Sequence, residues 1–206
     1  MRLLAIVLFA AIVPSVLMTA PVVATQYATQ LGLGPARIGQ LFSVELFAMS
    51  LATLPAYFWQ VRWDWRQVAR GAALLFIVAN LASAWSNDYG ALLALRAVSA
   101  LAGGTLMVIC IASAAGSAQP DRVYGLWVSG QLILGALGLW LLPPLFASIG
   151  LKALYLSLAL LMLLCLPLAG AFPPSAPIAP GNVSRAAGAH RWLPGPAAPA
   201  ATPEPA

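Results

Sequence analysis

Long runs of apolar residues set the strictest limit on how this chain can fold. The hydrocarbon core of a bilayer is about 30 Å thick, so a helix needs about 20 largely apolar residues to cross it. Six such runs follow one another in the sequence: 3–25, 40–59, 67–86, 91–113, 124–147 and 153–172. Between them lie short stretches with glycine, proline or polar residues, which suit turns at the headgroup layer. The sequence therefore predicts an all-α membrane protein with six transmembrane helices.

The composition excludes most other classes of protein. Only 7% of the 206 residues are charged and 62% are hydrophobic, whereas soluble domains carry about 25% charged residues. A soluble enzyme and a disordered chain are both excluded on this ground. The net charge of +5 does not indicate nucleic acid, because most charges lie near the ends of apolar runs. The only histidine is His190 and no phosphate-binding loop is present, so we expect no enzyme activity, cofactor or metal site.

The basic residues predict the orientation of the chain. With the N-terminus inside the cell, seven of them are cytoplasmic and only two, Arg37 and Lys152, are outside. The cytoplasmic excess of Lys and Arg makes this the expected arrangement, with both termini cytoplasmic. The seven are Arg2, Arg62, Arg66, Arg70, Arg122, Arg185 and Arg191.

Both ends of the chain invite further interpretation. Arg2 and the apolar stretch after it also resemble a secretory signal peptide, whose cleavage would leave the remaining orientation unchanged. The sequence alone leaves this alternative open.

Residues 173–206 are rich in proline and alanine and cannot build a packed core, so we expect a disordered cytoplasmic tail after a membrane domain of residues 1–172.

Two charged residues fall within the apolar runs. Glu45 lies in the second run and Arg96 in the fourth, each about 9 Å or less from the outer end at 1.5 Å per helical residue. Charges inside a membrane usually face a protein interior or a water-filled cavity and often serve function. Their matched depths allow a pair between them. The alternative is that each side chain reaches separately to the outer headgroups.

Small residues on the fourth and fifth runs predict close helix packing. Lipid gives helices no hydrophobic reason to associate, so small side chains that admit a neighbouring backbone are used instead. A hinge is the functional alternative. The residues are Gly103, Gly104, Gly130, Gly135 and Gly138.

The order of these features resembles the N-terminal half of a major facilitator superfamily transporter. The run 31–39 resembles the outer loop before the second helix, and the run 120–125 resembles the short loop before the fifth. Arg96 with Gly103 and Gly104 is similar to the fourth-helix motif of the family. The glycines of the fifth run match its glycine-rich fifth helix.

The resemblance implies half of a bundle, built of two inverted three-helix repeats. It implies a secondary active transporter in the cytoplasmic membrane that moves a small solute by alternating access, with helices one, two, four and five facing the path. Glu45 and Arg96 would then serve the substrate or proton pathway. Arg62, Asp64 and Arg66 would form the gating loop, although Gln60 stands where that loop normally has glycine.

The length departs from the family, which typically has twelve helices. Six helices offer one wall of a path, so the expected partners are membrane lipid, a small-molecule substrate and a second copy or a partner half. The alternative is a truncated chain, or a membrane subunit or scaffold that does not transport. Ala136 stands where antiporters have a proline, so antiport is not indicated.

Overall fold

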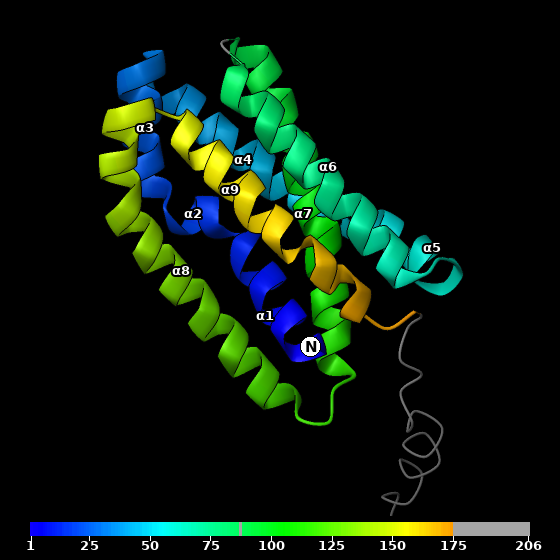
Figure 1. The fold of residues 1–206 in the computed structure, drawn as a ribbon. Coiled ribbons are helices and arrows are strands. Elements are labelled where there is room, and N and C mark those ends of the chain that lie inside the picture. The colour runs from blue at the N-terminus through cyan, green and yellow to red at the C-terminus, as the bar shows by residue number, and fades with distance from the viewer. Residues whose placement is uncertain (87, 175–206) are drawn as a thin grey trace, which may run out of the picture.

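The computed structural model describes residues 1–86 and 88–174, and within them the chain is helical with no strand (Figure 1). The helices run up and down as one bundle. Their bounds are α1 Arg2–Ile12, α2 Ser15–Met18, α3 Ala20–Leu31, α4 Pro35–Leu51, α5 Thr53–Arg62, α6 Trp65–Trp85, α7 Tyr89–Ala115, α8 Pro120–Ile149, α9 Lys152–Cys165 and the 3-10 helix η1 Leu166–Ala171.

The connections alternate between the two ends of the bundle (Figure 1). The α5–α6 and α7–α8 turns lie at the end where α1 begins and where the described chain finishes. The α3–α4, α6–α7 and α8–α9 turns lie at the other. We call the first of these the basic end, because Arg2, Arg62, Arg66, Arg70 and Arg122 occupy it. This alternation is what six membrane crossings require.

Five helical segments are long and apolar enough to cross a membrane: 35–62, 65–85, 89–115, 120–149 and 152–171. They correspond to the second through sixth expected spans. Several begin earlier than expected. Pro35 opens the second span at its first turn, where the missing N–H costs nothing. Asp88 begins the fourth by accepting a bond of 2.7 Å from the backbone N–H of Ala91.

The first span, expected over residues 3–25, is interrupted rather than one continuous helix. This segment is divided into α1, α2 and α3, and it continues to Leu31. Pro14 interrupts it because proline has no N–H to donate and its ring disrupts a helix interior. Gly32 ends α3 in the left-handed conformation with φ 62°, which glycine adopts without steric cost.

The centre of the bundle contains α1. Ala5, Phe9 and Ala10 on this helix are fully buried, and α1 packs against α7, α8 and α9. The largest helix interfaces are α6 with α7 and α4 with α7. Large apolar side chains remain exposed on α4, α5 and α8, as expected for surfaces that meet lipid or another protein: Phe47, Leu54, Tyr57, Leu132, Ile133 and Trp140.

The predicted tail of residues 173–206 lies outside the described residues apart from its first two. The carbonyl of Pro174 accepts a hydrogen bond of 3.2 Å from the backbone N–H of Trp65. The bundle therefore extends slightly beyond the expected boundary at residue 172.

Candidate functional site

Glu45 and Arg96 form an ion pair inside the bundle. Arg96 Nε on α7 donates to Glu45 Oε1 on α4, and this is the only salt bridge in the described part of the chain. Arg96 is 3% exposed and Glu45 6%. Neither side chain reaches out to a headgroup layer, so the separate-snorkelling alternative does not describe this structure. Because α4 begins at Pro35, Glu45 lies about 15 Å along its helix, deeper than expected.

Asn80 on α6 holds the other edge of the guanidinium. Its Oδ1 accepts a bond of 2.8 Å from Arg96 Nη1. Its Nδ2 donates to the Phe76 carbonyl at 2.8 Å and to Ser99 Oγ at 2.9 Å. Asn80 is fully buried, and these bonds offset the cost of burying an amide. The Arg96 position is therefore fixed by two helices besides its own.

Two tyrosines complete the surroundings of Arg96. Its guanidinium carbon lies 5.4 Å from the ring centre of Tyr155 on α9, a distance at which an aromatic face attracts a cation. The Tyr155 hydroxyl is 2.7 Å from that of Tyr27 on α3. Both tyrosines are 1% exposed. The charged pair thus joins residues from α3, α4, α6, α7 and α9 into one buried polar network.

Our sequence reasoning identified the two charges but not their neutral partners. Asn80 is a lone amide within the third apolar run, and such a residue is costly in a membrane helix unless it is bonded. That cost is the feature of the sequence that could have identified Asn80 as part of the site. The pairing of Tyr27 with Tyr155 joins residues 128 positions apart, and no local pattern indicates it.

A small cavity of about 20 Å³ lies beside the pair. A water molecule needs about 10–15 Å³ of such space, so about one fits. The cavity touches Glu45, Arg96 and Ser99, and it is bounded by Val13, Val16 and Leu17 around the break in the first span. The interruption at Pro14 therefore lies next to the charged pair.

The break itself is bonded to α8. Pro14 cannot donate to the carbonyl of Ala10, four residues earlier. Gln131 Nε2 on α8 donates to that carbonyl instead, at 2.9 Å. The first span is thus held to the fifth by a bond that exists because the helix is interrupted.

The residues expected to form a gating loop have identifiable contacts at the basic end. Asp64 caps α6, accepting a bond of 2.8 Å from the Arg66 N–H. Arg66 Nε donates to the Phe172 carbonyl at 2.8 Å, tying the loop to the end of η1. Arg62 lies exposed in the last turn of α5. The contacts position the loop, while its gating role stays a prediction.

The five selected glycines all lie where a neighbouring helix approaches. A Cβ on Gly104 would overlap the Met49 carbonyl and come within 2.8 Å of Ala52 Cβ, so α7 meets the α4 backbone there. A Cβ on Gly103 would lie 2.9 Å from Val13 Cγ1. On α8, Gly130, Gly135 and Gly138 face the first span at Val7, Met18 and Thr19. These contacts are what close helix packing produces, and the hinge alternative stays a prediction.

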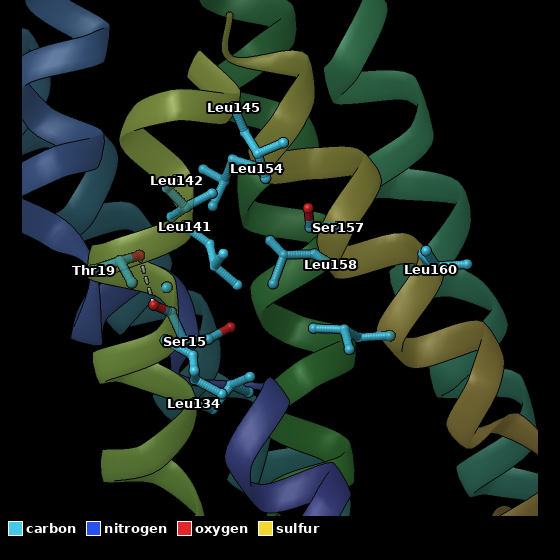
Figure 2. A pocket seen from close by; sticks show the side chains of 13 residues that line it. Ser15, Thr19, Leu134, Leu141, Leu142, Leu145, Leu154, Ser157, Leu158 and Leu160 are labelled. Carbon is cyan, nitrogen blue, oxygen red and sulfur yellow. Dashed lines mark hydrogen bonds between the residues drawn. The ribbon is translucent and has the colours of Figure 1, made fainter. Parts of the chain in front are cut away.

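An apolar groove of about 340 Å³ lies between α2, α8 and α9 (Figure 2). Leucines of α8 and α9 form most of its wall. Its three hydroxyls, on Ser15, Thr19 and Ser157, all donate to backbone carbonyls three or four residues earlier in the chain. They therefore offer a polar solute no free donor, and the groove is suited to an apolar chain.

The described residues contain no group of three or more His, Cys, Asp or Glu side chains that could hold a metal ion. Among the acidic residues of the described bundle, Glu45 belongs to the ion pair with Arg96. The others lie near helix ends, where Asp64 and Asp88 are N-caps.

Comparisons with known proteins agree with this architecture. The family model for the Major Facilitator Superfamily matches residues 3–202. A solved structure of the proton:xylose symporter XylE, bound to 6-bromo-6-deoxy-D-glucose, superimposes with a TM-score of 0.65 at 15% sequence identity. That match covers 84% of this chain and 44% of the symporter, so the chain spans less than half the length of this neighbour. No curated protein matches the chain. Because the family model matches nearly the whole length of this chain, the chain belongs to the Major Facilitator Superfamily, a family of multi-pass membrane transporters.

Proposed function

We propose that this chain supplies one half of a proton-coupled secondary transporter, with Glu45 as the group that binds the proton. The observation that carries the proposal is the buried Glu45–Arg96 pair beside a break in the first span. A carboxylate in such a place is costly, and functional residues are the usual reason for that cost. The membership of the chain in a transporter family supports the assignment.

Protonation of Glu45 would change the balance of forces between α4 and α7. The neutral carboxyl no longer attracts the guanidinium, whereas Asn80 and the Tyr155 ring still hold Arg96 in place. Only α4 loses its charged tie. Since Gly104 seats the α4 backbone further along α7, α4 keeps a contact about which it can tilt. A proton that weakens one tie and leaves the others intact can bias two conformations.

The solute path needs a second wall. This chain provides the first, and a second copy or a separate partner half completes the cavity in which alternating access takes place. The ligand of the solved neighbour is a sugar analogue, so pentoses and hexoses are the first solutes to test.

The test is transport in proteoliposomes that contain the chain alone or together with a partner half. An inward proton gradient should drive accumulation of labelled solute and alkalinise the bath. Glu45→Gln should abolish this coupling. Asp121→Asn makes the same acid-to-amide change at an exposed position of α8 and should leave the coupling intact. A membrane subunit that does not transport predicts no flux in either preparation, and that result would overturn the proposal.

A further inference from the structure

Buried polar atoms without a partner lie toward one end of the described bundle. Four side-chain nitrogen or oxygen atoms are buried and make no hydrogen bond there: Arg2 Nε, Ser113 Oγ, Ser117 Oγ and Trp127 Nε1. They belong to the first turn of α1, to the end of α7 with the turn that follows it, and to α8 about two turns from its start. All three segments lie at the basic end (Figure 1). Elsewhere in the described residues, buried polar side chains have found partners.

Contacts between α1, α7 and α8 connect these segments. Arg2 Nη2 donates to the Ser113 carbonyl at 2.8 Å, joining α1 to α7. On α8, Gly130 faces Val7, with a Cβ there 3.1 Å from Val7 Cγ1. Because α1 and α8 run in the same direction (Figure 1), Trp127, one turn before Gly130, stands level with the first turn of α1.

All four groups can donate a hydrogen bond. Arginine Nε and tryptophan Nε1 can only donate, while serine hydroxyls can donate as well as accept. Arg2 has no acid within salt-bridge distance among the described residues. Arg122, in the first turn of the long helix α8, adds positive charge at the same end, and Asp121 beside it is exposed. Donors and cations together fit an anion with several acceptor oxygens.

We propose that this cluster binds the phosphate group of a membrane phospholipid in the leaflet at the basic end. Leu3, Leu4 and Leu126 are exposed beside it, 39%, 49% and 41% respectively, and they offer apolar contact to acyl chains. A free phosphate would gain nothing from those leucines. This site is separate from the Glu45–Arg96 network and does not depend on the transport proposal.

The decisive variant is Trp127→Phe, which removes the indole N–H together with one of the two fused rings. In lipid-free detergent the smaller ring leaves a cavity at this buried position, so the variant should unfold at a lower temperature than the wild type. With dioleoylphosphatidylglycerol in mixed micelles, the variant should bind the lipid about tenfold more weakly. A purely structural role for Trp127 predicts this lower unfolding temperature, but the same lipid retention by the folded variant as by the wild type.

The experiment measures unfolding temperature and lipid retention by native mass spectrometry, using the full chain. Arg2→Gln should weaken phosphatidylglycerol binding at least as much as Trp127→Phe, while Arg62→Gln, an exposed charge at the same end, should not. Dioleoylglycerol, which lacks the phosphate, should be retained far less. Equal binding of the Trp127→Phe variant and wild type would overturn the proposal. So would stabilisation by inorganic phosphate equal to that by phosphatidylglycerol, since the site would then not be a lipid site.

Discussion

Separating Glu45 from Arg96 by mutation should reveal how strongly the buried pair is coupled. Both side chains are almost fully buried, and removing one member of such a pair typically costs about 3–5 kcal/mol. Glu45→Gln leaves a guanidinium that still has Asn80 and the Tyr155 ring, so we expect a loss of about 3 kcal/mol. Arg96→Gln should cost a similar amount at neutral pH.

The double variant carries two neutral amides and should be at least about 2 kcal/mol more stable than the sum of the single losses predicts.

The assay is unfolding of the purified chain in mixed micelles with increasing sodium dodecyl sulfate, followed by circular dichroism. Asp121→Asn is the matched control, because it changes an exposed acid in the same way. If the two single losses add to within about 0.5 kcal/mol, the residues do not interact and the reasoning is refuted.

Three further predictions concern packing, the tyrosine pair and topology. Gly104→Ala should destabilise by about 1–3 kcal/mol in the same unfolding assay, because its Cβ would press on the α4 backbone; Gly125→Ala, with nothing within 4 Å, should be neutral or stabilising. Tyr27→Phe and Tyr155→Phe should each cost about 1 kcal/mol by leaving the other hydroxyl unpaired, and the double variant should cost less than their sum. A reporter fused after Ala206 should be active only in its cytoplasmic form, and a periplasmic signal would contradict the orientation inferred from the arginines.

Much of the fold follows from the apolar runs, because membrane crossing depends on length and hydrophobicity, which a sequence displays directly. The interruption of the first span could not be predicted in the same way. Pro14 and Pro21 are plain in the sequence, but membrane helices often tolerate proline when a neighbour satisfies the freed carbonyl. Whether such a neighbour exists depends on Gln131, 121 residues away from Ala10.

The candidate site also has a part that the sequence indicates and a part that it does not. Charges inside a membrane are visible in any sequence, so Glu45 and Arg96 were found, and their helical depths indicated that they could meet. Asn80, Tyr27 and Tyr155 join them only through tertiary packing of α3, α6 and α9 around α7. Neutral polar side chains are common in membrane helices, so their presence alone did not mark them as partners of Arg96.

The most direct test of the account is infrared difference spectroscopy of the purified chain in lipid, recorded between high and low pH. The stretching band of a protonated carboxylic acid reports whether a buried glutamate has taken up a proton. Glu45 as the proton-binding group predicts a carboxylic acid band that appears at low pH and is lost in Glu45→Gln, while Asp121→Asn retains it. A band that persists unchanged in Glu45→Gln would contradict the account.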